Sequence, residues 1–436
     1  MTDSAPTRPD RVAPERTLGL RGGIALAIGS VAGSGILFLP SVLVRLTGPD
    51  VLVVWAIATA LCIPLLFIFG EMVREVPDGS GIEGFIARGL GPNVAACVPV
   101  LFLSVYYAGL PAATLVAGGY LEEAVGGGRP VRLGGALLVI AGSLYTNLVG
   151  SRRGASLQSI ATWTLLAAAL ALIVLTVPEA HHHYSALVPH LHHLDPILGG
   201  IVVGFWAYAG FENMTFVAGE MHNPRRDYLL ATLAALLAYG LLAALLTANI
   251  AAIIPRNDVG RLAGVAQLAH HTAIPGIGVA VITLLAIALV QANAASWLWG
   301  ISRLLFSAAR DGRFPRWYTA IDGRGIPRRS VLSLVIPGTV MTALASIRPG
   351  LVVPLVVGVS GIFMFLYLLA LASYLRTPRS RGRRVVAGAL FLFMGGVLAT
   401  RGWYFAYPVA LSAITYAVAR RRLPPAAHDP EDAPGY

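Results

Sequence analysis

Apolar runs long enough to cross a lipid bilayer recur along almost the whole of this chain. A helix needs roughly 20 mainly apolar residues to cross the hydrocarbon core. Only 12% of the 436 residues are charged, whereas about a quarter are charged in an ordinary soluble domain. The bilayer is therefore the expected solvent for most of the chain, and no room is left for a separate soluble domain.

Polar and Gly/Pro breaks between the apolar runs predict an all-α protein with twelve membrane-spanning helices. The predicted spans are 20–46, 51–70, 93–120, 133–149, 156–177, 196–220, 228–254, 274–309, 331–345, 351–374, 385–400 and 403–418. The first 18 residues are polar and lack an apolar stretch followed by a small-residue cleavage site. They predict a cytoplasmic tail and not a signal peptide.

The distribution of basic residues tests the number of spans. All 32 are arginine; with twelve spans, 24 fall on the side of the N-terminus, seven on the other side, and Arg303 lies inside a span. The positive-inside rule then places both termini in the cytoplasm of a bacterial inner-membrane protein. A missed helix would invert half of the loops and destroy this bias. Because the arginines are spread over alternate short loops, they do not form the patch that a nucleic-acid partner requires.

The first predicted span is interrupted by glycines near its middle, at Gly29, Gly33 and Gly35. Unwound backbone is tolerated in a membrane only where it is buried in protein or lines a wet cavity. The alternative is close packing of small residues, which the spacing of Gly29 and Gly33 also allows. On its own, this feature does not decide between the two.

The sixth predicted span carries a second interruption, at residues 204–213. The two interrupted spans are five spans apart. Because five is an odd number, a repeat unit that begins at span six crosses the membrane in the opposite direction to one that begins at span one. Interrupted helices at corresponding positions of inverted repeats are the best indication, from sequence, of a transporter's central site. Taken together, the two breaks favour a binding site over simple packing.

The two breaks offer complementary chemistry. The second half of span one is expected to begin near Ser34 or Gly35, where free backbone N–H groups attract an α-carboxylate. The first half of span six is expected to end at residues 206–209, where unpaired carbonyl oxygens attract an α-ammonium. One zwitterion satisfies both, with Trp206, Tyr208 and Phe211 as walls or as simple packing residues.

Several motifs in the same order resemble the amino acid–polyamine–organocation (APC) superfamily. They are GSGI at 33–36, FWAYAGFE at 205–212, EMHNPRRD at 220–227 and SRLLFSAARDGRFP at 302–315. Segments 102–113 and 150–155 are most similar to bacterial methionine and branched-chain amino acid exporters. The resemblance implies a five-plus-five inverted-repeat core at 20–374 with helices one and six discontinuous, two further helices at 375–419, and cytoplasmic tails at 1–19 and 420–436.

Similarity to arginine/agmatine antiporters implies that Trp206 and Trp297 flank the substrate and that Glu212 lies just below it. The predicted substrate residues are Ala32, Gly33, Ser34, Gly35, Ile36, Tyr107, Phe205, Trp206, Ala207, Tyr208, Gly210 and Trp297. Glu212 is the only carboxylate deep inside a predicted span. We expect the protonation of Glu212 to be coupled to transport or to gate it. The alternative is that Glu212 holds the broken helix by a structural hydrogen bond.

For an arginine, a group of histidines and the two cysteines, we expect structural roles. Arg303 is expected to snorkel or to pair with Glu220 or Glu71. The histidines 181–183, 190, 192 and 193 indicate a solvated external loop, and a metal or pH-sensing site is the weaker alternative. Cys62 and Cys97 lie in apolar runs and are expected to pack. No metal or cofactor is implied.

These features predict a secondary transporter that exports or exchanges neutral, apolar amino acids by alternating access. The alternatives are an importer of amino acids or amine-containing metabolites, a non-transporting amino acid sensor, and a membrane-embedded transferase. The chain has no His-Glu-x-x-His motif, paired acidic motif or nucleotide loop, which argues against an enzyme. The expected partners are an amino acid and membrane lipid. A coupled proton, sodium or second amino acid, and a homodimer, are left open.

Overall fold

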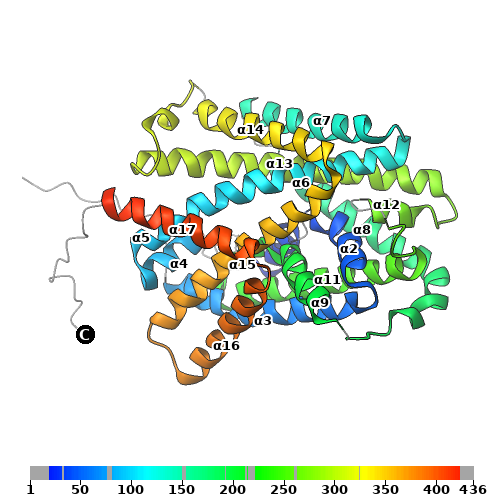
Figure 1. The fold of residues 1–436 in the computed structure, drawn as a ribbon, viewed down its shortest axis with the longest axis horizontal. Helices are drawn as coiled ribbons and strands as arrows, with labels where there is room; N and C mark the ends of the chain where they lie inside the picture. The colour runs from blue at the N-terminus through cyan, green and yellow to red at the C-terminus, as the bar shows by residue number, and fades with distance from the viewer. Residues whose placement is uncertain are drawn as a thin grey trace, which may run out of the picture.

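Long apolar helices run alongside one another through most of the molecule (Figure 1). The computed structural model describes residues 19–31, 34–75, 81–149, 154–191, 193–211, 214, 221–259, 263–323 and 325–422. The α-helices are α1 Leu20–Val31, α2 Gly35–Thr47, α3 Val51–Glu75, α4 Gly81–Leu90, α5 Pro92–Ala95, α6 Cys97–Val125, α7 Gly128–Val149, α8 Gly154–Ala180, α9 Leu194–Phe205, α11 Pro224–Ile253, α12 Gly264–Ala269, α13 Pro275–Arg310, α14 Arg328–Ile347, α15 Val352–Arg376, α16 Arg381–Ala399 and α17 Trp403–Arg422. Short 3-10 helices are η1 Gly48–Asp50, η2 His181–Leu187, η3 Trp206–Tyr208, η6 Arg316–Thr319 and η7 Pro349–Leu351.

Nine helical stretches in the described part of the chain are long and apolar enough to cross a membrane. Two shorter apolar helices, Leu20–Gly29 and Leu194–Tyr208, lie where spans one and six were predicted to be interrupted. Each of the other predicted spans coincides with a helix. The all-α polytopic class is therefore confirmed, whereas the twelve crossings and the inverted repeat stay predictions.

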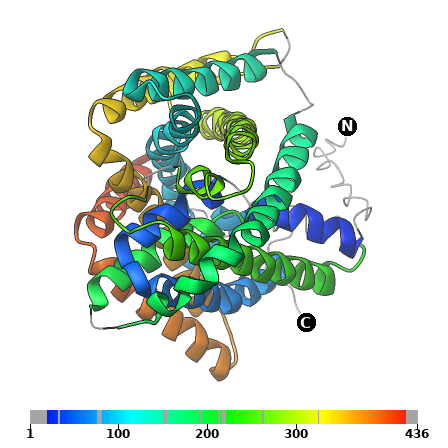
Figure 2. The ribbon, with the colours of Figure 1, turned by 90° about the vertical axis from the view of Figure 1, so that its right-hand side faces the viewer.

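Large apolar side chains are found both inside the bundle and on its outside. Leu284, Leu241 and Leu392 are exposed on α13, α11 and α16. A water-soluble bundle would bury such residues, but lipid tails solvate them. Inside, α2, α3, α6, α9, α11 and α15 supply most of the buried core. Figure 2 shows the bundle from one end, with α13 seen along its axis.

Helices α6 and α7 approach closely because both carry glycine at the crossing. A Cβ atom added at Gly118 of α6 would lie 1.9 Å from the carbonyl oxygen of Arg132 on α7. One added at Gly135 would lie 2.9 Å from the Cα atom of Gly118. Small residues at such a contact allow two backbones to pack directly in a membrane protein.

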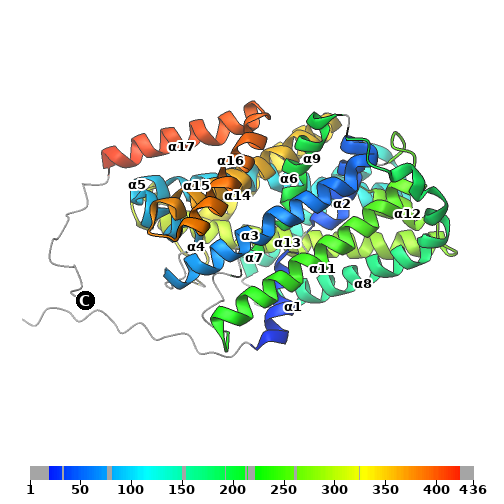
Figure 3. The ribbon, with the colours of Figure 1, turned by 90° about the horizontal axis from the view of Figure 1, so that it is seen from below.

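Ion pairs lie at both ends of the bundle, and we call the end that holds Glu71 and Glu75 the arginine-rich end. There Glu75 pairs with Arg88 at 3.5 Å and with Arg379, and Glu71 pairs with Arg383 at 3.2 Å. In Figure 3, α4 lies toward this end and α12 toward the opposite one. Helices α4 and α12 were not predicted from the sequence, since each is too short to give a membrane-spanning signal.

The opposite end is held by hydrogen bonds between loops. Arg45 donates to the carbonyl oxygen of Val259 at 2.8 Å. The backbone N–H of His190 donates to Asp50 at 2.8 Å. Arg256 donates to the carbonyl oxygens of Arg45 and Leu46, at 2.9 and 3.0 Å. These bonds connect the ends of α2 and α11 with the connection before α9.

Candidate functional site

The first helix break separates α1 from α2. Helix α1 ends at Val31, and α2 begins at Gly35 with the buried Ser34 before it. Ser34 makes no side-chain capping hydrogen bond, and its carbonyl oxygen accepts from the N–H of Leu37 at 3.1 Å. The first amides of a helix have no acceptor within that helix, and in the described part of the chain no other backbone acceptor is found for those of Gly35 and Ile36. Such amides can bind an anion. The predicted start of the second half-helix is confirmed; Ala32 and Gly33 lie outside the described residues.

The second break ends α9. After Phe205 the chain makes the short η3 turn, and Ala209 is extended, with φ −61° and ψ 126°. Gly210 follows with φ 122°, a backbone conformation that side-chain-bearing residues rarely adopt. The predicted end at residues 206–209 is therefore confirmed. Glu212 lies outside the described residues, so its role stays a prediction.

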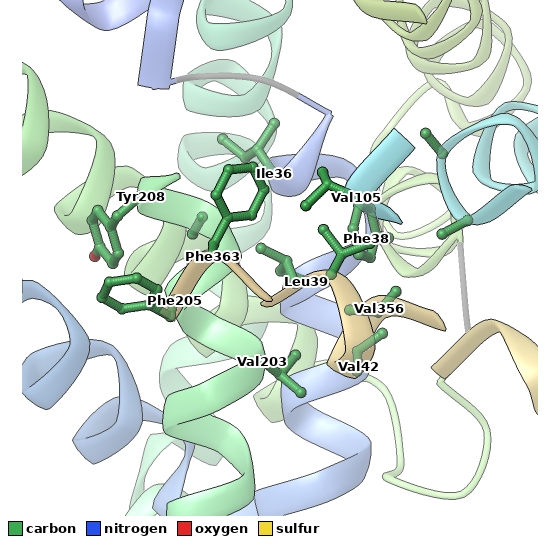
Figure 4. Packing of buried hydrophobic residues seen from close by; sticks show 14 of the residues in the cluster. Ile36, Phe38, Leu39, Val42, Val105, Val203, Phe205, Tyr208, Val356 and Phe363 are labelled. Carbon is green, nitrogen blue, oxygen red and sulfur yellow. The ribbon is translucent and has the colours of Figure 1, made fainter. Parts of the chain in front are cut away.

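The two breaks meet in the folded protein. A Cβ atom added at Gly35 would lie 3.7 Å from the Cα atom of Ala207. Beside this contact, Phe38 of α2 packs edge-on against Trp206, with ring centroids 5.3 Å apart. Figure 4 shows the surrounding core, in which Ile36 and Phe38 of α2 lie near side chains of α6, α9 and α15. The helix ends that the sequence predicted to share one ligand are thus neighbours.

Tyr208 is fully buried and held on both sides. Its hydroxyl shares a 2.5 Å hydrogen bond with Thr59 Oγ1 of α3. Its ring packs edge-on against Trp55 and Tyr239, with centroids 6.2 and 6.1 Å away. Gly240 leaves the space for this arrangement, because a Cβ atom there would lie 2.8 Å from the Tyr208 hydroxyl. The hydroxyl of Tyr208 is therefore engaged in joining η3 to α3.

Phe205 and Trp297 pack against other aromatic rings. Phe205 is buried against Tyr367 of α15, at 5.3 Å between centroids. Trp297 of α13 packs against Phe102 and Phe363, at 6.5 and 6.1 Å. Among the described residues, no ring contact links Trp297 to Trp206.

Tyr107 of α6 is directed toward another helix. Its hydroxyl donates to the carbonyl oxygen of Ser333, on α14, at 3.0 Å. The structure therefore brings together Ser34, Gly35, Ile36 and residues 205–210, and gives Tyr107 and Trp297 other contacts.

Sequence reasoning missed Tyr239, on α11. It is only 2% exposed, and its hydroxyl has no hydrogen-bond partner among the residues that the structure describes. A Cβ atom added at Gly35 would lie 3.4 Å from this hydroxyl oxygen. The available signal was a Tyr-Gly pair inside an otherwise apolar span, 236–246. That signal is weak, since tyrosines in membrane helices often only pack.

Of the structural alternatives for Arg303, the pairing with Glu71 is not formed in the described part of the chain. The guanidinium of Arg303 lies 3.7 Å from the ring centroid of Trp299, one turn earlier on α13, and donates to the Trp299 carbonyl oxygen at 3.2 Å. Glu71 instead accepts from the Tyr374 hydroxyl at 2.5 Å and pairs with Arg383. A cation stacked on a tryptophan of its own helix needs no distant carboxylate. Glu220 lies outside the described residues.

The remaining polar candidates are the loop histidines and the two cysteines. His181, His182 and His183 are exposed on η2, and the rings of the first two are tilted by 46° with their centroids 3.7 Å apart. Within the described ranges, no group of three or more metal-capable side chains is present. Cys62 and Cys97 are both buried, as predicted, and the Cys97 thiol donates to the carbonyl oxygen of Ser412 at 3.2 Å.

Comparison with known proteins agrees with the resemblance seen in the sequence. The L-methionine/branched-chain amino acid exporter YjeH of Escherichia coli (strain K12) is 26% identical over 422 residues, covering 94% of this chain and 98% of YjeH. The uncharacterized amino acid permease YecA of Bacillus subtilis (strain 168) is 26% identical over 402 residues, covering 90% and 93%. The cadaverine/lysine antiporter of E. coli (strain K12) is 22% identical over 341 residues, covering 76% of each chain.

A family model described as "Amino acid permease" matches residues 18–419. These relatives are transporters and not enzymes, and their similarity extends over the membrane-spanning helices of this chain. The protein is therefore a multi-pass membrane protein and a transporter that belongs to the amino acid permease family of the APC superfamily.

Proposed function

We propose that this protein exports or exchanges neutral, apolar amino acids by alternating access. The observation that carries this proposal is the contact between the two helix breaks, where Gly35 faces Ala207. A free amino acid carries a carboxylate and an ammonium on one carbon atom. The N-terminus of α2 attracts the first group and the C-terminal end of α9 attracts the second.

The side chains around the breaks favour an apolar substrate side chain. Phe38, Trp206 and Ile36 are aromatic or aliphatic, and all are buried or half-buried. A lysine side chain or a second ammonium group would leave water for this environment, and burial of a charge is costly unless a partner compensates it. This supports methionine, leucine and similar amino acids over diamines. YjeH, whose name gives such substrates and outward transport, supports export.

The predicted arrangement in the membrane belongs to the same proposal. Twelve crossings, with a five-plus-five inverted repeat and two further helices, place both termini in the cytoplasm by the distribution of arginine. In this orientation the arginine-rich end faces the cytoplasm. Glu212 lies at the second break in the sequence and is proposed as the group that couples transport to protons.

Within this proposal, exchange of two substrates is supported by the similarity of the chain to an antiporter. Exchange and export are distinguished by the need for a substrate on the far side of the membrane. A strict exchanger releases leucine only when another substrate enters, whereas an exporter also releases it into substrate-free medium.

Counterflow in proteoliposomes tests the proposed function. Vesicles loaded with unlabelled leucine or methionine should accumulate the labelled amino acid from outside, and vesicles without protein should not. A sensor or an enzyme on the same scaffold would bind or modify the amino acid without accumulating it. Absence of counterflow for every neutral amino acid would overturn the proposal.

A further inference from the structure

We propose that the Tyr239 hydroxyl is a specificity-determining group that makes the site require a free α-carboxylate. This inference rests on the proposed function above, and it assigns the carboxylate a side-chain ligand from α11 in addition to the backbone amides of α2. It follows from the position of Tyr239, from the orientation of its ring, and from the chemistry of the donors beside it.

The Tyr239 hydroxyl is buried in the core beside the helix breaks. Tyr239 is 2% exposed, and its hydroxyl oxygen has no hydrogen-bond partner among the described residues. Buried polar groups in proteins are almost always hydrogen-bonded, so an unpaired one calls for an explanation. A ligand that arrives with acceptor atoms would provide the missing bond.

The Tyr239 hydroxyl lies close to the start of α2. It lies 3.4 Å from the position of a Cβ atom added at Gly35, the first residue of α2, and the same position lies 3.7 Å from the Cα atom of Ala207. The Cα–Cβ bond of a helical residue is tilted toward the N-terminus of its helix. The Tyr239 hydroxyl therefore lies beside the first turn of α2, where the two breaks meet.

The Tyr239 ring is held in this orientation by its neighbours. Tyr239 packs edge-on against Tyr208, with an interplanar angle of 82°. Tyr208 is fixed in turn by its hydrogen bond to Thr59 and by its contact with Trp55. A donor positioned before the ligand arrives loses little entropy when it binds.

The chemistry of these groups selects for a carboxylate. The amides of Gly35 and Ile36 are donors only, and the tyrosine hydroxyl can act as a third donor. A carboxylate is an acceptor only and takes bonds from all three, each assisted by its charge. An amine without a carboxylate leaves the donors unpaired, and a site built on hydrogen bonds strongly rejects such a compound. Cadaverine, named for the antiporter relative, is a compound of that kind.

Competition in proteoliposomes tests the inference. Labelled leucine counterflow is measured against unlabelled leucine, leucinamide and isopentylamine, the amine that leucine gives on decarboxylation. In the wild-type protein, leucine should compete at a concentration about 100-fold or more below that of either analogue. In Tyr239→Phe, the leucine concentration for half-inhibition should rise about 10-fold while the values for the analogues hardly change.

Tyr120→Phe is the matched control. It also removes a buried tyrosine hydroxyl near α2, one that donates to the carbonyl oxygen of Leu37 at 2.7 Å. This change should alter stability and leave the ratio between leucine and leucinamide unchanged. If Tyr239→Phe keeps the wild-type ratio while counterflow is active, the role assigned to Tyr239 is wrong and the proposed function stands. If the wild-type protein shows no counterflow, the proposed function fails first.

Thermal unfolding in detergent provides a second, independent measurement. Phenylalanine removes a hydroxyl that is unpaired without ligand, so Tyr239→Phe should unfold at or above the wild-type temperature in the absence of substrate. The stabilisation by added leucine should be smaller than in the wild type, because the affinity is lower. A lower unfolding temperature without ligand, combined with full stabilisation by leucine, would show a structural hydroxyl and overturn the inference. Should the variant not fold, equal competition by leucine and leucinamide in the wild type would also overturn it.

Discussion

Gly35, at the start of α2, lies against Ala207 in η3, and a Cβ atom at Gly35 would come within 3.7 Å of the Ala207 Cα atom. The same Cβ atom would lie 3.0 Å from Leu39 Cδ1. Larger side chains at Gly35 therefore extend into the junction of the two breaks. This relationship gives the most direct test of the site.

We expect Gly35→Val to weaken binding of all amino acid substrates about equally, by about 10-fold or more, since it blocks the shared head group. Gly29→Val is the control, because a Cβ atom at Gly29 meets nothing within 4 Å among the described residues. Binding is measured from the concentration dependence of counterflow for leucine, methionine and valine. A change in the preference among them, without a general loss, would assign Gly35 to the side-chain pocket.

Gly240→Ala should destabilise the protein by about 1–3 kcal/mol. The added methyl group would lie 2.8 Å from the Tyr208 hydroxyl and 2.9 Å from Thr59 Oγ1, so it would break the hydrogen bond between them. Gly358→Ala on α15, where a Cβ atom meets nothing within 4 Å, is the control and should be neutral or slightly stabilising. Thermal unfolding in detergent measures both. Equal unfolding temperatures for the two variants would contradict the assigned packing.

Glu212→Gln should remove the pH dependence of exchange between about pH 5 and pH 8. Glutamine keeps the size of the side chain and much of its hydrogen bonding but cannot ionise. If Glu212 only holds the broken helix, Glu212→Gln will keep the wild-type pH profile and Glu212→Ala alone will lower stability. Exchange of labelled leucine at several pH values decides between the two roles.

Glu75 should stabilise the arginine-rich end in a pH-dependent way. The hydrogen bond from Arg379, together with the charges of Arg379 and Arg88, lowers the pKa of Glu75 below its ordinary value of 4.5, although burial opposes this. A carboxyl group with a lowered folded pKa contributes stability that is complete above the ordinary value and is lost as the pH falls through the folded pKa. Glu75→Gln should therefore lower the free energy of unfolding by about 1 kcal/mol at pH 7, and by less below about pH 4.

The exposed carboxylate Glu179 provides the comparison for Glu75. Glu179→Gln removes a carboxylate at the opposite end that is 46% exposed, and it should change the unfolding temperature less at pH 7. Unfolding temperatures measured from pH 3 to pH 8 test both variants. If the loss of stability in Glu75→Gln became larger as the pH falls, the ion pairs of Glu75 would not be the cause of that loss.

Cells that lack the protein should be more sensitive to dipeptides containing methionine or leucine. Hydrolysis inside the cell releases an amino acid that these cells cannot expel, so its internal concentration should rise. The internal amino acid pools and the growth rate measure the effect, and restored expression should reverse it. Unchanged sensitivity together with slower uptake would make the protein an importer.

Several features of the fold were predictable from local sequence. Apolar run length placed α3, α6, α13 and α15 within a few residues of their observed positions. Clustered glycines marked the break before Gly35, and Gly210 marked the one after η3, because glycine lowers helix propensity and permits unusual backbone angles. Helices α4 and α12 were not predicted, since neither is long enough to be recognised as an apolar run that spans the membrane.

Side-chain partners between distant parts of the chain were not predictable in the same way. The sequence left three alternatives for Arg303, which were snorkelling or pairing with Glu220 or with Glu71. The structure stacks Arg303 on Trp299 and pairs Glu71 with Arg383. For Tyr208 the sequence left open a pocket wall or simple packing, and it gave no indication that the hydroxyl would join Thr59, 149 residues earlier in the chain. The sequence around Tyr239 did not distinguish it from a tyrosine that only packs, so it was not predicted as a site residue.

The sequence by itself determined that the chain enters a membrane and where its helices break, and it predicted which chemical groups those breaks offer to a substrate. These properties depend on hydropathy and backbone preference over about 20 residues or fewer. Only the tertiary structure decided that Gly35 meets Ala207 and that the Tyr239 hydroxyl lies beside them. Such contacts depend on how whole helices cross and rotate against one another, and that is set by the packing of many side chains together.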